Sequence, residues 1–248
     1  MHSTVAAAFL ALCPLLPVQA QTIVDAEYFA PTDSYPHGVL GDDQEWGAVQ
    51  ITVKRQRGEP GSLISGYVNL TYRIDALPDT VFEDLEPRLW DVTGDGSPEV
   101  VVVESHQSYG ARLMVIGLQD GELRYIAATP YIGTRFRWLA PVGAADLDGD
   151  GHVEIAFIDR PHLAQMLRIW RFKDDALTEI AAIPGFANHR IGEDFISGGL
   201  RNCGAGPELI VVSGDWSRIA AVAFHKRWVE RHVGPYTGPE SLTAALAC

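Results

Sequence analysis

The segment Asp146-Leu-Asp-Gly-Asp-Gly-His-Val-Glu154 is acidic and rich in glycine, and it leads directly into the apolar segment Ile155-Ala-Phe-Ile158. The same arrangement occurs earlier, where Asp91-Val-Thr-Gly-Asp-Gly-Ser-Pro-Glu99 leads into Val100-Val-Val-Val103. Short apolar segments rich in β-branched residues and bounded by Gly or Pro are typical of strands buried on both faces. The two copies lie 55 residues apart, so the chain contains an internal repeat that decides its fold.

Four such apolar segments recur at a period of roughly 50–55 residues, which is the spacing of propeller blades. They are residues 48–53, 99–104, 154–159 and 208–213. Hairpin-like pairs of strands follow the later three, with a turn at Asp120-Gly121 in one of them. We therefore predict an all-β fold, a small β-propeller of about four four-stranded blades. A fifth blade built from residues 23–30 and the tail after Gly234 is one alternative, and a two-sheet sandwich is another.

The acidic loops carry the ligands that a hard cation prefers. Oxygen atoms at loop positions 1, 3, 5 and 9, with a glycine at position 6 and the carbonyl of position 7, can surround a cation that takes 6–8 oxygens. An EF-hand needs glutamate at position 12, where this chain has Val102 and Phe157, so that motif is excluded. We expect about two structural Ca²⁺ sites. Their candidate ligands are Asp146, Asp148, Asp150, His152 and Glu154, and Asp91, Thr93, Asp95, Ser97 and Glu99.

An Asp-x-(Asp/Thr)-x-Asp-Gly-x-x-Glu loop followed by an apolar strand resembles the FG-GAP or VCBS repeat of the integrin-α-like β-propellers. In that family the loop binds calcium and joins the innermost strand of a blade to the second strand. The resemblance implies the same role for the residues of both loops, with Glu154 and Glu99 where the family more often has Asp. It describes the type of blade and says little about function.

The remaining two repeats depart from this pattern. In the stretch 200–208 only Glu208 is kept and both key aspartates are missing, whereas Asp42 and Asp43 of the first repeat lie in the wrong register. We therefore predict two calcium sites and not four. After a leader is removed, the remaining cysteines are Cys203, inside the degenerate loop, and Cys248. In an oxidising compartment they are most simply one disulfide, which would attach the C-terminal tail to the last blade; two free thiols are the alternative.

The first twenty residues are predicted to be a signal peptide. The segment from Val5 to Leu16 is apolar but too short to span a bilayer, and Val18-Gln19-Ala20 fits a signal-peptidase site. The domain is then residues 21–248, and we expect it to be exported, either periplasmic or secreted, with no membrane span. The formal charge of −13 makes binding to nucleic acid or an anionic membrane a poor prospect.

The sequence contains no catalytic motif: a Gly-x-Ser-x-Gly elbow, a His-Glu-x-x-His pair and a phosphate loop are all missing. We therefore expect a monomeric binding or adhesion module for a glycan or a protein rather than an enzyme. A structural or assembly component of the cell envelope and a hydrolase of envelope polymers are the alternatives. The partner would bind the loop face opposite the calcium loops, although Trp138 and Trp216 are also candidates for packing between blades. The residues expected on that face are His106, Tyr109, Arg137, Arg160, His162, His189, Arg190 and Trp216.

Overall fold

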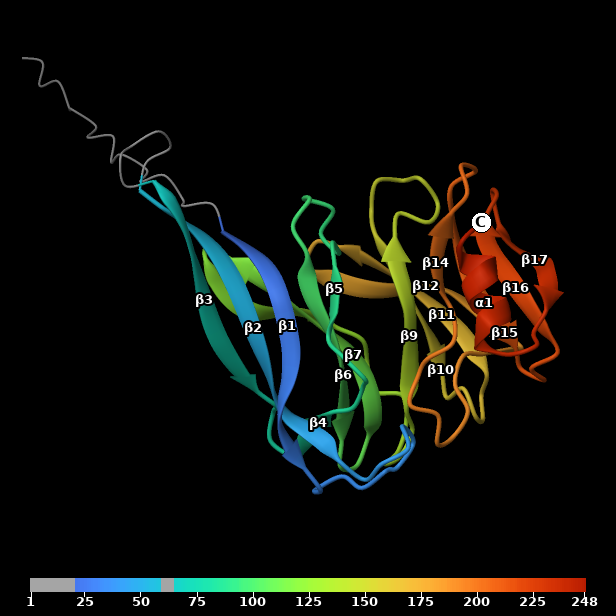
Figure 1. Cartoon of the computed structure of the whole chain (residues 1–248), viewed down its shortest axis with the longest axis horizontal. Coiled ribbons are helices and arrows are strands. Elements are labelled where there is room, and N and C mark those ends of the chain that lie inside the picture. The colour runs from blue at the N-terminus through green and yellow to red at the C-terminus, as the bar shows by residue number, and fades with distance from the viewer. Residues whose placement is uncertain (1–20, 59–64) are drawn as a thin grey trace, which may run out of the picture.

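The computed structural model describes residues 21–58 and 65–248, which form seventeen strands in three antiparallel sheets and one helix (Figure 1). The fold is all-β in the sense that the sequence predicts. The predicted signal peptide, residues 1–20, lies outside the described residues. In the part of the chain that the structure describes, no helix is long and apolar enough to cross a membrane.

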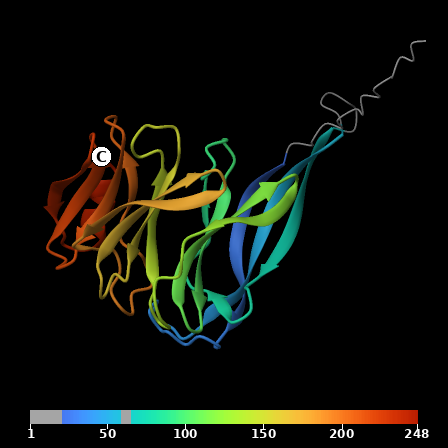
Figure 2. The ribbon, with the colours of Figure 1, turned by 180° about the vertical axis from the view of Figure 1, so that it is seen from behind.

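Three four-stranded antiparallel units, which we call blades A, B and C, follow one another along the chain. Each starts with an inner strand, continues through a central strand, and ends in an outer hairpin. The inner strands β9 and β14 lie side by side in Figure 1, and the outer hairpins of blades A and B are nearest the viewer in Figure 2. Blade A is β5 (Arg88–Trp90), β6 (Glu99–His106), β7 (Gly110–Gln119) and β8 (Glu122–Ala128); blade B is β9 (Leu139–Ala145), β10 (Glu154–Asp159), β11 (Met166–Lys173) and β12 (Ala176–Pro184); blade C is β14 (Gly199–Asn202), β15 (Pro207–Ser213), β16 (Arg218–Phe224) and β17 (Trp228–Pro235).

The first predicted repeat does not form a blade of this kind. Residues 48–53 lie in the long strand β2 (Glu45–Arg57), which pairs with β1 (Gln21–Thr32) on one side and β3 (Gly66–Asp75) on the other. Through Trp46 and Phe82 this three-stranded sheet joins the short strand β4 (Thr80–Phe82), and β4 continues into blade A. The described residues therefore contain three four-stranded blades and an N-terminal sheet, so a count of four blades is not confirmed.

The C-terminal tail does not join the N-terminal strand to complete a further blade. It forms the helix α1 (Pro239–Leu246), which the sequence analysis did not predict and which packs on β14 and β17. Leu242 and Ala245 bury its apolar side against Ile210 and Val212 of blade C. A disulfide joins Cys203 to Cys248, with their Cα atoms 5.7 Å apart, and attaches the end of the helix to the loop before β15.

The central strands of the blades are buried on both faces, and their side chains alternate between two cores. Val101 and Val103 of β6 pack with Ile155 and Phe157 of β10, filling the space between blades A and B. The alternate residues of β10 pack toward Leu209 and Val211 of β15, between blades B and C. Each apolar segment of the repeat thus stabilises two interfaces at once, which explains its uninterrupted hydrophobicity.

The inner edge of blades A and C is interrupted by loops that carry polar residues into the interior. On β6, β4 pairs with residues 104–106 and β5 with residues 99–101, so residues 83–87 leave the sheet between them. On β15, β13 (Phe186–Ala187) and β14 flank a longer excursion, residues 188–198. Blade B has only a one-residue irregularity at the equivalent place. These excursions bring Glu83 and His189 to the blade edge opposite the acidic loops.

Candidate functional site

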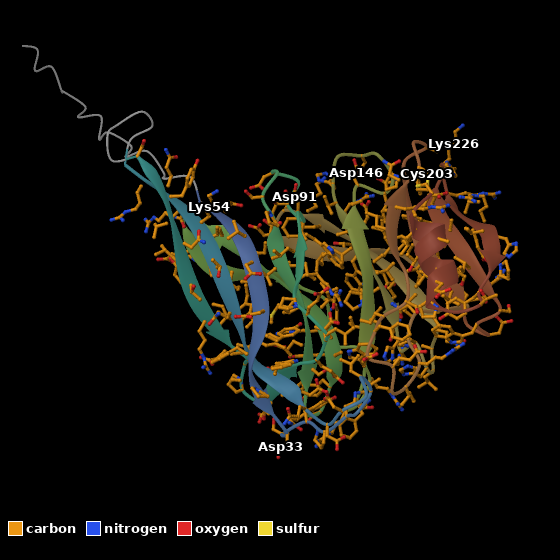
Figure 3. The ribbon with its side chains drawn as sticks, viewed as in Figure 1. Asp33, Lys54, Asp91, Asp146, Cys203 and Lys226 are labelled. Atoms are coloured by element: carbon orange, nitrogen blue, oxygen red, sulfur yellow. A yellow bond between two sulfur atoms is a disulfide. The ribbon has the colours of Figure 1, made fainter. Side chains whose placement is uncertain are left out.

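The two acidic loops lie on one edge of the molecule. Asp91, Asp146 and Cys203, which mark the equivalent loops of the three blades, are neighbours along that edge in Figure 3, and Asp33 lies at the opposite one. The loops precede β6, β10 and β15, as the repeat phase predicts. The opposite edge collects the loop 33–44, the loops after β8 and β10, and the excursion 188–198.

The loop 146–154 is organised by Asp146. Its carboxylate accepts hydrogen bonds from the backbone N–H groups of Gly149 (2.8 Å), Asp150 (3.1 Å) and Gly151 (3.0 Å). Gly149 and Gly151 have φ of 79° and 88°, a region that glycine adopts without strain. The His152 N–H donates to Asp150 (2.9 Å), and Glu154 accepts from the Leu147 N–H (2.8 Å). Together with the bond from the Asp150 N–H to Asp148 (3.2 Å), these contacts close the turn.

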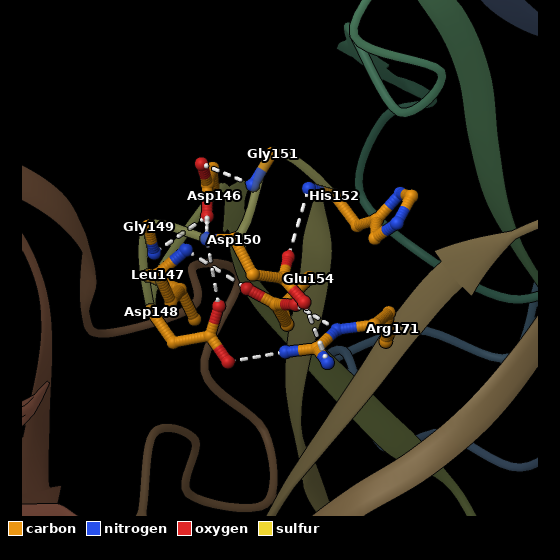
Figure 4. A network of polar contacts seen from close by, with 9 residues as sticks. All are labelled: Asp146, Leu147, Asp148, Gly149, Asp150, Gly151, His152, Glu154 and Arg171. Atoms are coloured by element: carbon orange, nitrogen blue, oxygen red, sulfur yellow. Dashed lines mark hydrogen bonds and ion pairs between the residues drawn. The ribbon is translucent and has the colours of Figure 1, made fainter. Parts of the chain in front are cut away.

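A guanidinium from the neighbouring strand faces three carboxylates of this loop (Figure 4). Arg171, which is opposite Glu154 in the β10–β11 register, bonds Glu154 (2.6 Å), Asp150 (2.8 Å) and Asp148. Glu154 is fully buried, and burial raises its pKa while the contact with Arg171 opposes that rise. The oxygen donors of Asp146, Asp148 and Glu154 lie within 4.8 Å of one another, which suits a hard cation, but Arg171 already supplies positive charge there.

The loop 91–99 has the same backbone design without the arginine. Asp91 accepts from the N–H groups of Gly94 (2.8 Å), Asp95 (3.1 Å) and Gly96 (2.9 Å), and the Ser97 N–H donates to Asp95 (2.8 Å). Glu99 accepts from the Val92 and Thr93 N–H groups (2.7 and 3.0 Å) and from the Thr93 hydroxyl (3.3 Å). Beyond the last β6–β7 pair, Val100 with Ile116, the residue of β7 next to Glu99 is Gly117, which has no side chain to offer. Burial raises the pKa of Glu99, and no arginine offsets it in the described residues.

In blade C two arginines surround the glutamate that the repeat retains. Arg201 and Arg231 both bond Glu208, at 2.8–3.0 Å. Burial raises the pKa of Glu208, but the two guanidinium groups outweigh burial and the pKa is lowered. The disulfide of Cys203 lies in the same loop. A donor set of one glutamate already paired with two arginines does not fit a calcium ion.

A cavity of about 430 Å³ opens at the edge opposite the acidic loops. Of the eight residues expected on this face, three line the cavity, namely Arg137, Arg160 and His162, and His189 bonds His162 directly behind it (3.1 Å). The remaining lining residues are His37, Val39, Phe136, Trp138, Pro161, Leu163 and Ile191.

The other four expected residues lie outside the cavity. Arg190 lies over the ring of Trp216, 4.1 Å from its centroid, and Trp216 packs on Tyr236. His106 and Tyr109 pack on each other and on Tyr131.

Trp138, which lines the cavity, is buried between blades, where its indole N–H donates to the Glu83 carbonyl (2.8 Å).

Several residues of this site were not predicted from the sequence, namely His37, Glu83 and Phe136 and the apolar lining residues Val39, Pro161, Leu163 and Ile191. His37 and Glu83 come from the loop 33–44 and the excursion 83–87, and neither segment belongs to the repeat pattern. The buried Tyr35 connects the loop 33–44 to the loop after β8, because its hydroxyl accepts the Phe136 N–H (2.7 Å). The interruption of the repeat pattern by the loop 33–44 and the excursion 83–87 would have been the sequence signal, and it does not identify a partner.

Comparison with known proteins identifies the repeat but no close relative. The FG-GAP-like repeat family matches residues 91–157, which run from the first acidic loop into β10. No curated protein matches the chain. Among solved structures, a protein of Lactobacillus plantarum matches with a TM-score of 0.39 and 9% identity, over 77% of this chain and 54% of its own. This chain thus spans about half the length of that protein. Residues 91–157 are FG-GAP-like repeat sequence, as the acidic loops and their spacing predict.

Proposed function

We propose that this protein is an exported binding module that holds a glycan or protein partner at the cavity opposite its acidic loops. The observation that carries the proposal is the cavity itself, since four loops from the N-terminal sheet and blades A, B and C converge on it. Loops on a rigid scaffold are the usual location of binding residues, and small-ligand cavities commonly measure about 300–1,000 Å³.

The side chains that line the cavity favour binding over catalysis. Its described lining contains arginine, histidine and apolar side chains, and none of them is a serine, threonine or cysteine that could act as a nucleophile. Ser105 is buried, and its hydroxyl donates to Glu83 rather than reaching the cavity.

We also propose that calcium stabilises the module through the acidic loops. The loop 91–99 is the better candidate, because no arginine among the described residues pairs with its carboxylates, whereas calcium in the loop 146–154 must compete with Arg171. Extracellular modules bind calcium at roughly 10⁻⁴–10⁻³ M. Thermal unfolding of the full chain in calcium and in chelator measures this contribution.

Glycan and peptide arrays probed with the purified protein test the binding proposal. The matched pair of variants is Ile191→Asp and Tyr67→Asp, which add one charge at exposed apolar residues of the cavity rim and of β3 respectively. We expect Ile191→Asp to abolish array binding and Tyr67→Asp to leave it unchanged. Equal loss, or no loss, in both variants contradicts placing the ligand in this cavity.

A further inference from the structure

The cavity is basic although the chain is strongly acidic. Its walls carry Arg137, Arg160, His37 and His162 and no acidic residue, while the whole chain has a formal charge of −13. The Arg137 side chain is exposed and has no ion-pair partner in the described part of the chain. A local reversal of charge of this kind is complementary to an anion.

Two buried acids behind the walls limit how much negative charge the cavity can accept. Asp159 accepts two bonds from Arg160 (2.7 and 3.0 Å) and one from Arg168 (2.7 Å). Glu83 is fully buried and bonds Nδ1 of His37 and the Ser105 hydroxyl. Because these carboxylates offset part of the positive charge, the cavity suits a single negative charge such as a carboxylate, and not a phosphate dianion.

Hydrogen bonding leaves one nitrogen on each of the two cavity histidines for a ligand. Since Nδ1 of His37 bonds Glu83, Nε2 is the ring nitrogen left for a ligand, and it donates to a carboxylate when both ring nitrogens carry a proton, as in an ion pair with Glu83. His189 donates from Nε2 to the Glu193 carbonyl (2.8 Å), so its Nδ1 accepts the N–H of His162 Nε2 (3.1 Å). His162 Nδ1 is then an acceptor. Partial burial, with His189 and His37 nearby, lowers the pKa of His162 to about 4, which keeps that ring neutral.

Apolar and strained residues complete the cavity. Leu163 and Ile191 are 63% and 72% exposed at its rim, and the ring of Phe136 stacks on His37 with centroids 4.9 Å apart. Phe136 and Arg160 have positive φ, 61° and 47°, a region in which the backbone of non-glycine residues is strained. Such strain concentrates at binding sites, where the surrounding fold holds a side chain in place for a ligand.

We propose that this cavity binds an apolar amino-acid residue with a free α-carboxylate and an acylated N–H. The carboxylate pairs with Arg137 and His37 Nε2, the N–H donates to His162 Nδ1, and the apolar side chain covers Leu163 and Ile191. This chemistry occurs at the C-terminus of a peptide and in a free N-acyl amino acid. The inference rests on the proposed function, because it specifies the ligand class of the same cavity.

The test is titration of the full-length mature chain with N-acetyl-L-phenylalanine and its neutral amide, followed by NMR. A hexapeptide ending in Phe, as acid and as amide, forms the second arm. We expect both acids to bind and both amides to bind at least about tenfold more weakly, since a charge-assisted hydrogen bond contributes about 1.5–3 kcal/mol. If only the peptide acid binds, the proposal holds with a peptide C-terminus as the source.

A matched pair of arginine variants tests whether the acids bind in this cavity. Arg137→Gln removes the unpaired cation of the cavity, and Arg124→Gln removes an exposed cation from β8 that pairs with Glu122. We expect about a tenfold loss of acid binding in Arg137→Gln and none in Arg124→Gln. His162→Phe, which keeps a ring but no acceptor, is expected to weaken binding of the acids as well.

Equal binding of acid and amide, or equal loss in the two arginine variants, overturns the inference. Failure of both acids to bind at millimolar concentration also overturns it. The proposed function survives such failures if an array ligand still binds and is lost in Ile191→Asp. The two proposals therefore fail separately.

Discussion

Replacement of Arg171 by alanine tests how the loop 146–154 is neutralised. The guanidinium bonds Asp148, Asp150 and Glu154, whose side chains are 14%, 38% and 0% exposed. Removing one partner from a buried ion pair costs about 3–5 kcal/mol, because the remaining charge is left without compensation. Since Asp150 is partly solvated, we expect a loss near the lower limit, about 3 kcal/mol. For a protein of this length that loss lowers Tm by roughly 6–12 °C in chelator.

Calcium is expected to restore most of this loss. The variant leaves Asp146, Asp148, Asp150 and Glu154 without a resident cation, and three of these acids already converge within 4.8 Å. At about 100 times the dissociation constant, a bound ion adds about 2.7 kcal/mol. For a dissociation constant of about 10⁻⁴ M that condition is about 10 mM calcium. Differential scanning calorimetry of Arg171→Ala in chelator and in calcium measures both effects.

The matched control is Arg168→Ala, on the same strand β11. Arg168 bonds Asp159 (2.7 Å) and Glu179 (2.6 Å), away from the acidic loop. This variant should lose stability to the same degree in calcium and in chelator. If Arg171→Ala also loses equal stability in both conditions, the loop 146–154 does not take up calcium. If Arg171→Ala loses nothing in chelator, the reasoning about buried charge is wrong.

Three further predictions concern the tail, the loop geometry and pH. Cys248→Ser opens a covalent loop with a sequence separation of 45 residues and should cost up to about 4 kcal/mol, measured by urea unfolding with and without reductant. Gly110→Ala places a Cβ 2.6 Å from the Thr134 carbonyl at φ 74°, whereas Gly149→Ala, at φ 79°, meets nothing within 4 Å. Gly110→Ala should therefore lower Tm more than Gly149→Ala, and equal shifts would contradict the clash. His162, with its pKa lowered to about 4, binds a proton less readily when folded than when unfolded, so its contribution to stability falls as pH drops from about 6.5 to 4. Unfolding of His162→Phe across that range should show a flatter pH profile, and an NMR titration of His162 near pH 6.5 would refute the shift.

The repeat was readable from the sequence because each central strand has the same two-sided environment. Glu99 and Glu154 start strands with apolar residues on both faces, and an acidic loop precedes each. The segment 48–53 is also rich in β-branched residues, but its strand is longer and pairs with β1 and β3 on its two sides. Apolar composition alone does not distinguish the centre of a blade from the centre of a long three-stranded sheet, so the blade count could not be read reliably.

The cavity opposite the acidic loops was only partly predictable for a different reason. Arg160 and His162 follow a repeat strand directly, and their position on one face follows from the strand direction. His37 and Glu83 reach the cavity from an irregular loop and from an interruption of a strand edge, and they meet only through tertiary contacts. Arg171 was not predictable either, because its place opposite Glu154 depends on the β10–β11 register, which the connection 160–165 sets and the turn at Asp174-Asp175 between β11 and β12 does not.

The three blades neutralise the same glutamate in three ways, and the comparison suggests where calcium matters most. Glu99 in blade A is held by N–H groups and a hydroxyl, Glu154 in blade B by Arg171, and Glu208 in blade C by two arginines beside a disulfide. Resident positive charge thus increases along the chain, and a cross-link is added at its end. An ion that stabilises by supplying positive charge should therefore contribute most in blade A and least in blade C. This order reverses the one that carboxylate counts alone would give, since blade A offers three carboxylates to the four of blade B.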